Sequence, residues 1–128
     1  MVLAVDIMRK SVITTEPADI VMDAAKKMAK NKIGSLVVVK DDKIVGIVTW
    51  RDIVTRVVAQ GLDPKACKVD TIMTQPVITC SPTTPIRDIV KILHQNKINR
   101  LPVVDRDSLV GIITAYDVCL HGWGAPSP

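Results

Sequence analysis

The sequence predicts a mixed α/β fold (α+β) of two tandem β-α-β-β-α repeats that pack sheet to sheet with approximate twofold symmetry. The first observation is an internal repeat, because Ile7–Ile53 aligns without a gap on Ile72–Val118, sixty-five positions downstream. The second is that strand-like and helix-like periodicities alternate within each repeat. The third is the continuous aliphatic run Leu36–Val39, which predicts a strand buried on both faces. The two repeats are therefore expected to cover one another's sheets.

The first strand and first helix of each repeat are marked by short signals. Ser11–Thr14 is an expected strand, which Glu16-Pro17 ends. Asp19 is expected to cap a helix in the first repeat. Thr84 is the expected cap in the second repeat, where Pro85 suits the first helical position. The apolar stripe of the first helix comprises Val21, Ala24, Ala25 and Met28.

A hairpin and a second helix complete each repeat. Leu36–Val39 and Ile44–Thr49 are expected strands on either side of the polar turn Lys40–Lys43. The second helix is expected from about Asp52 to Gln60, with Gly61 as its C-cap. The expected organisation is repeat 1–61, linker 62–68, repeat 69–121 and a flexible tail 122–128.

Composition limits the classes of protein that fit. The 128 residues suffice for one core, which must be aliphatic because aromatic residues make up only 2% and phenylalanine is absent. No apolar run approaches the roughly 20 residues that span a bilayer, and no signal peptide is evident, so the cytoplasm is the expected compartment. The three cysteines are scattered and expected to be reduced, and no metal site is expected.

The repeated motif carries the functional argument. Gly46–Asp52 and Gly111–Asp117 share the order glycine, two aliphatic residues, threonine, two variable residues and aspartate. Threonine and aspartate fall where a strand turns into a helix, three residues apart, and face the same way. One interpretation is a capping box, which only satisfies the helix N-terminus. The other is a ligand site, because free N–H groups at a helix N-terminus favour an anion such as a phosphate.

Over about residues 3–120 the chain resembles a pair of CBS (cystathionine-β-synthase) domains. The resemblance rests on the two motifs above, on the repeated Met8 and Met73, and on three further segments. These are Val12–Thr14, Val77–Thr79 and Lys97–Val104. It implies a regulatory module with two clefts between the repeats that bind adenosine-containing ligands. Family precedents are AMP, ADP, ATP, S-adenosylmethionine, NAD and cyclic dinucleotides.

The resemblance also implies roles for individual residues. The aspartates would bind the ribose, and the preceding threonines would lie near the phosphate: Asp52, Asp117, Thr49 and Thr114. Ile13 and Ile78 would offer backbone groups to adenine, each in the cleft that holds the other repeat's aspartate. The phosphate end would be lined by Gly34 and Ser35 in the first repeat and by Asn99 and Arg100 in the second.

The two clefts are expected to be unequal. Arg100 has no cationic counterpart in the first repeat, which must rely on Arg51 from the turn, whose own counterpart is Tyr116. A forked cation suits phosphate oxygens, so the Asp117 cleft is expected to fill first with a phosphate-bearing ligand.

The expected function is non-enzymatic sensing of an adenine nucleotide, with no cofactor required and no membrane partner. No nucleophile with an adjacent base and no phosphate loop is visible. A homodimer is expected because the stripe Ile53, Val54, Val57 and Val58 has more apolar faces than one core needs. The regulated partner is expected to be a separate, unidentified chain. The alternatives are a ligand-free structural or dimerisation module and, less favoured at a net charge of +4, a basic nucleic-acid binder.

Overall fold

The computed structural model describes residues 1–121, and the chain divides into two compact units. The central unit is continuous in sequence, Ile13–Val77. The terminal unit combines Met1–Val12 with residues 78–121. The compact units therefore do not coincide with the sequence repeats, since each takes in a short segment of the other repeat. The tail 122–128, expected to be flexible, lies outside the described residues.

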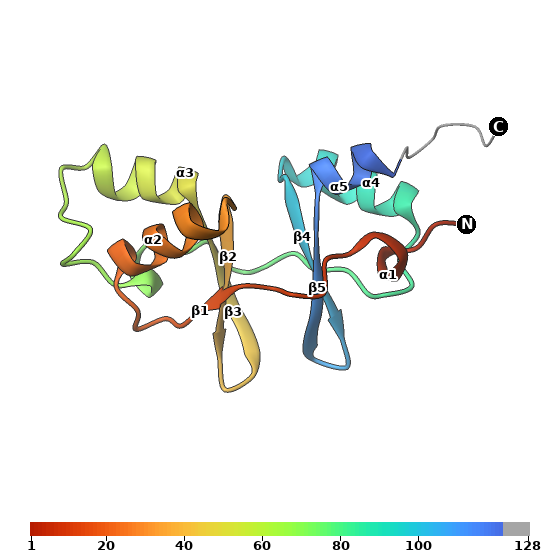
Figure 1. The fold of residues 1–128 in the computed structure, drawn as a ribbon, viewed down its shortest axis with the longest axis horizontal. Helices are drawn as coiled ribbons and strands as arrows, with labels where there is room; N and C mark the ends of the chain where they lie inside the picture. The colour runs from red at the N-terminus through yellow and green to blue at the C-terminus, as the bar shows by residue number, and fades with distance from the viewer. Residues whose placement is uncertain (122–128) are drawn as a thin grey trace. The chain divides into compact units, whose positions relative to one another are not determined.

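The central unit has the expected β-α-β-β-α order. Its sheet has the strand order β1-β2-β3, with β1 parallel to β2 and β2 antiparallel to β3. Both helices lie toward the end of the hairpin that is opposite its turn (Figure 1). A π-helical segment continues the second helix, and a 3₁₀ turn follows later. The elements are β1 Thr14–Thr15, α2 Val21–Asn31, β2 Ser35–Lys40, β3 Lys43–Thr49, α3 Trp50–Ile53, the π-helical Val54–Val58 and the 3₁₀ turn Val69–Thr71.

The terminal unit repeats this plan with one difference. Its first strand is reduced to a single parallel bridge between Cys80 and Val103, beside a two-stranded antiparallel sheet. The helices again lie away from the hairpin turn (Figure 1). The elements are α1 Ala4–Ile7, α4 Ile86–Asn96, β4 Arg100–Asp105, β5 Ser108–Thr114 and α5 Ala115–Leu120.

The hairpin turns fix the register that positions the candidate sites. Asp41 and Asp42 have φ angles of 52° and 63°, the left-handed pair of a two-residue turn whose twist matches the strands. The resulting register sets Ser35 opposite Thr49 at the other end of the hairpin. In the terminal unit the same arrangement sets Arg100 opposite Thr114. Each hairpin thus brings two predicted site residues together.

Each unit has its own core, and both cores are aliphatic, as the composition predicts. The central core includes Val21, Met28, Leu36, Val48 and Val57, all buried. The terminal core includes Ile7, Ile89, Leu101, Ile113 and Val118. No described helix has the length and apolar character needed to cross a membrane.

The predictions for the helix starts were wrong in detail. The helix α2 begins after Ile20, and Asp19 instead accepts hydrogen bonds from the Glu16 N–H at 2.8 Å and the Thr15 hydroxyl at 2.7 Å. These bonds lower the pKa of Asp19 and close the turn before the helix. In the terminal unit Pro85 occupies the cap position of α4, while Thr84 accepts a hydrogen bond from the Ser81 N–H.

The second helix begins earlier than expected and ends near the expected place. Trp50 is its first residue, because Thr49 caps it. The helical segment runs on to Val58, and Gly61 has a φ of +71°, the left-handed conformation expected of a residue that ends a helix.

Candidate functional site

A reciprocal pair of hydrogen bonds joins Thr49 and Asp52 at the turn from β3 into α3. The Thr49 N–H donates to Oδ2 of Asp52 at 2.9 Å, and the Asp52 N–H donates to Oγ1 of Thr49 at 3.2 Å. Asp52 is only 7% exposed. The capping-box interpretation is therefore confirmed in the central unit.

The terminal unit builds the same box at the turn from β5 into α5. The Thr114 N–H donates to Oδ2 of Asp117 at 3.0 Å, and the Asp117 N–H donates to Oγ1 of Thr114 at 3.1 Å. Asp117 is 4% exposed. Both motifs thus hold a buried carboxylate with one oxygen bound to the main chain and the other directed elsewhere.

The neighbouring backbone amides are also engaged. The Trp50 N–H donates to the carbonyl of Gly34 at 3.0 Å, and the Ala115 N–H donates to the carbonyl of Asn99 at 2.8 Å. With the amides of the capping boxes, most N–H groups at each turn already have partners. A phosphate at either turn would therefore depend largely on side-chain donors, which differs from the expectation that helical N–H groups would hold it.

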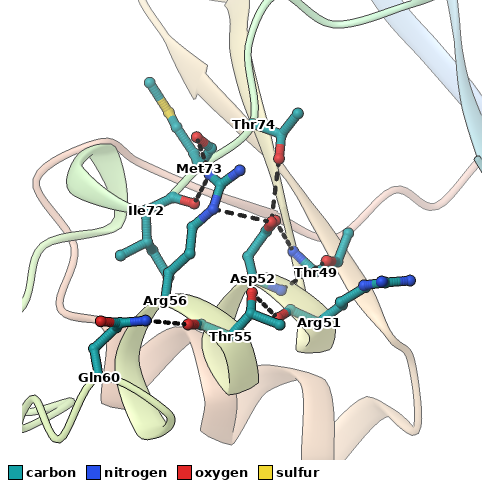
Figure 2. Close-up of polar contacts among 9 residues, drawn as sticks. All are labelled: Thr49, Arg51, Asp52, Thr55, Arg56, Gln60, Ile72, Met73 and Thr74. Carbon is teal, nitrogen blue, oxygen red and sulfur yellow. Dashed lines mark hydrogen bonds and ion pairs between the residues drawn. The ribbon is translucent and has the colours of Figure 1, made fainter.

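Asp52 has two further partners (Figure 2). The Thr74 hydroxyl donates to its Oδ1 at 3.2 Å, and Nε of Arg56 lies 3.9 Å from the same oxygen. Arg56 also donates through Nη1 to the carbonyls of Ile72 and Met73, at 2.8 Å and 3.2 Å. Its guanidinium thus ties the helical segment to the strand-like stretch that ends the central unit.

Asp117 has a different partner. Nε of Arg9 donates to its Oδ1 at 3.0 Å, in an ion pair between residues 108 positions apart. The Arg9 side chain is 55% exposed, whereas that of Asp117 is only 6% exposed. Among the residues that the structure describes, the Arg9 side chain makes no second hydrogen bond, while its backbone pairs with that of Ile112.

The structure groups the predicted site residues by unit. At the end of each hairpin lie the two residues predicted to line the phosphate end of a cleft, together with the threonine and the aspartate of the same repeat. In the central unit these are Gly34, Ser35, Thr49 and Asp52. In the terminal unit they are Asn99, Arg100, Thr114 and Asp117. Ile13 belongs to the central unit, like Asp52, and Ile78 to the terminal unit, like Asp117. Their assignment to the opposite aspartates stays a prediction.

Two predicted residues of the turns face solvent. Arg51 is exposed, and its side chain extends away from the Asp52 carboxylate (Figure 2). Tyr116, at the equivalent position, is 63% exposed. The cation beside Asp52 is Arg56, which the sequence analysis missed.

Arg9 and Thr74 were missed as well, although the repeat contains a signal for them. Both follow the repeated pair Ile-Met, and they are sixty-five positions apart, so they occupy equivalent sites. A change from threonine to arginine within an otherwise matching stretch marks a position where the two sites differ chemically.

The motif glycines admit a methionine side chain. Gly46 is in contact with Met73, and Gly111 with Met8, at distances that leave no room for a β-carbon. Both methionines also pack against the core of their own unit, as expected of core-filling residues.

Potential metal ligands do not cluster in the described part of the chain, and one of its thiols is buried. Its histidines, cysteines and carboxylates form no group of three or more that could hold a metal ion. Cys80 is buried, and burial raises the pKa of its thiol to about 11, which disfavours the nucleophilic thiolate.

Two copies of a known domain account for this arrangement. The family model for the CBS domain matches residues 4–59 and again residues 69–122. This chain belongs to the CBS domain family. CBS pairs are regulatory, ligand-binding modules, and the twin threonine–aspartate turns are the corresponding parts of the two CBS domains here.

CBS relatives match most of the chain. The protein MK0525 of Methanopyrus kandleri is 39% identical over 115 residues, which cover 88% of this chain and 59% of that protein. The CBS domain-containing protein YhcV of Bacillus subtilis is 32% identical over 116 residues, which cover 91% of this chain and 82% of that protein. The chain thus spans less than two thirds of the first relative and most of the second.

Solved CBS structures share the fold. The CBS domain pair of protein MJ0100, in complex with 5′-methylthioadenosine and S-adenosyl-L-methionine, superposes with a TM-score of 0.87 at 33% identity and covers 98% of both chains. A hexameric CBS-CP12 protein from bloom-forming cyanobacteria has a TM-score of 0.90 at 32% identity, covering 99% of this chain and 75% of that one.

Proposed function

We propose that this CBS pair is a non-catalytic sensor that binds adenosine-containing ligands at its two threonine–aspartate turns and thereby alters the state of a partner protein. The observation that carries the proposal is the pair of buried carboxylates, Asp52 and Asp117, which the same capping box holds at the same place in each unit. The complex of the MJ0100 pair with two adenosine derivatives supports the ligand class.

The carboxylates have the acceptor capacity that a ribose diol needs. A carboxylate offers about four lone-pair positions. Each aspartate uses one of them on Oδ2 for the main chain and one on Oδ1 for a side chain, Thr74 or Arg9. Each oxygen therefore keeps an acceptor position, and two neighbouring hydroxyl groups could donate one hydrogen bond to each oxygen.

Other residues would complete recognition. Backbone groups of Ile13 and Ile78 are proposed to bind adenine, and Ser35 and Arg100 are proposed to meet the phosphate of AMP, ADP or ATP. The register supports the latter role, because Ser35 and Arg100 lie opposite the motif threonines.

Ligand binding is proposed to act through self-association or through a separate regulated chain. An exposed apolar stripe on the central unit supports an interface between two copies. It comprises Trp50, Val54 and Val58, which are 57%, 46% and 63% exposed, and it differs from the stripe expected from the sequence because Val57 is buried in the core. A ligand-free dimerisation module is the second candidate, and the same stripe favours it.

Calorimetry on the full chain separates the two candidates. Wild-type protein is titrated with AMP, ATP, S-adenosylmethionine and GMP, and compared with Asp52→Asn, Asp117→Asn and the exposed control Asp105→Asn. We expect adenosine ligands to bind wild type and the control, and each site variant to lose one binding event. A ligand at a hundredfold excess over Kd should stabilise the fold by about 2.7 kcal/mol. Binding by none of the adenosine ligands would favour the ligand-free module.

A further inference from the structure

We propose that Arg9 determines the specificity of the Asp117 site and selects adenosine ligands that carry a phosphate over uncharged ones. The inference rests on the proposed function, since it concerns the same site. Arg9 lies outside every motif that pointed to the site, and only the fold brings it to Asp117. Three observations carry the inference: the arginine beside each aspartate comes from a different position of the repeat, one guanidinium edge of Arg9 is open, and few backbone donors remain at the turn.

The arginine beside the aspartate comes from a different position of the repeat in each unit. In the central unit Arg56 comes from the helical segment after Asp52, and the second partner is the neutral Thr74. In the terminal unit Arg9 stands at the position equivalent to Thr74, and His121 stands at the position equivalent to Arg56. Each aspartate therefore has one arginine nearby, but the two arginines come from opposite sides of the motif.

Because the two arginines come from different positions, their guanidinium groups have different N–H donors left for a ligand. Arg56 faces Asp52 with its Nε and binds two carbonyls through Nη1, so each edge of its plane already has one donor in use, although its side chain is 49% exposed. The Arg9 guanidinium is bound only through Nε, as far as the described residues show, and its side chain is 55% exposed. The edge formed by its two Nη atoms can bind two oxygens of a phosphate at once.

Arg9 also removes an electrostatic obstacle. A carboxylate in the first turn of a helix repels a phosphate that approaches the same turn. The ion pair of 3.0 Å compensates the charge of Asp117 and places positive charge on its solvent side. Because the amides of Thr114, Ala115 and Asp117 are already bound, recognition of the phosphate depends largely on side chains. Arg9 supplies such a donor where Thr74 supplies none to the central unit.

Calorimetry with AMP and adenosine tests this role, and it is done in an Asp52→Asn background so that the terminal site is observed alone. Arg9→Thr installs the residue of the central unit, and Arg9→Lys keeps the charge without the fork. We expect Arg9→Thr to weaken AMP binding about tenfold while changing adenosine binding less than about twofold. Arg9→Lys should fall between wild type and Arg9→Thr. Thr74→Arg, in an Asp117→Asn background, should strengthen AMP binding at the central site.

The outcomes separate the two proposals. If the parent chain binds neither AMP nor adenosine, the proposed function fails and the role of Arg9 fails with it. If both ligands bind but Arg9→Thr leaves the ratio of their affinities unchanged, only the role of Arg9 fails. Equal weakening of both ligands would show that Arg9 acts structurally, and unfolding curves of the variants identify any loss of folded protein.

Discussion

Met73 crosses Gly46 so closely that a β-carbon at position 46 would lie 2.5 Å from its Sδ atom and 2.9 Å from its Cγ atom. Met8 makes the same approach to Gly111, at 2.6 Å and 2.8 Å. The glycine of the repeated motif is therefore required for packing between a strand and a segment distant in sequence. This is the close strand approach that glycine permits, rather than room for a ligand.

Gly46→Ala is expected to destabilise the central unit by about 1–3 kcal/mol, the usual cost of overpacking, because the Met73 side chain must move. The free energy of unfolding in urea measures the loss. The same substitution in a Met73→Ala background should cost less, since the clash is gone. An equal cost in both backgrounds would contradict the proposed clash, because contacting residues are expected to couple.

Asp19→Asn is expected to lower stability at neutral pH. The Glu16 N–H and the Thr15 hydroxyl bind the Asp19 carboxylate and lower its pKa below the ordinary value of 3.8. A lowered folded-state pKa gives stability that is present above pH 3.8 and is lost as the pH falls through the folded-state value. Unfolding curves of wild type and variant should therefore converge in acid. The exposed Asp70→Asn is the matched control variant, and a constant difference between wild type and Asp19→Asn would refute the linkage.

Cys80 is expected to make stability fall at alkaline pH. Its thiol has a pKa of about 11 when folded, against an ordinary value of 9.0. Between these pH values the unfolded chain has released a proton that the folded chain retains. Stability should therefore fall between about pH 9 and 11, by up to about 1.4 kcal/mol per pH unit from this group. Cys80→Ala should remove that part of the slope, which denaturation at several pH values can show, with the exposed Cys119→Ala as the matched control variant.

Val58→Lys is expected to weaken association between copies of the chain. Val58 is 63% exposed and lies four positions from Val54 on the helical segment of the central unit. A lysine would place a charge in the apolar interface that we propose. Light scattering at tens of micromolar should give twice the mass of one chain for wild type and for the control Gln60→Lys, and a lower mass for Val58→Lys. A monomeric wild type would end the homodimer proposal.

Local chemistry predicted much of the fold because its signals are short in range. The Asp41-Asp42 turn set the hairpin, and the threonine–aspartate spacing set the capping boxes, both within a few residues. The starts of α2 and α4 were missed because Asp19 and Thr84 found partners in the preceding turn. A side-chain oxygen near a helix start can serve either role, and the sequence does not separate them.

Long-range pairings were beyond such reasoning. The contact of Arg9 with Asp117 joins residues 108 positions apart, and no local pattern relates them. That Met1–Val12 belongs to the terminal unit could not be predicted either, for a second reason. Ile7-Met8 and Ile72-Met73 are the same residues, so either segment offers the same side chains to either repeat. Only substitutions that break the repeat, such as Arg9 for Thr74, distinguish the two.

The split of the terminal unit has a consequence for the order of events during translation. Met1–Val12 is synthesised well before the rest of its own unit, which begins at Ile78 and extends through Ala115–Leu120. The central unit is contiguous and can fold in between, as domains commonly do during synthesis. Until the last helix emerges, Ile7 and Met8 remain without their core, and they are apolar side chains of the kind that chaperones bind. Of the two units, the terminal one is therefore incomplete for longer during synthesis, and a variant that slows translation beyond Val77 should lengthen that interval.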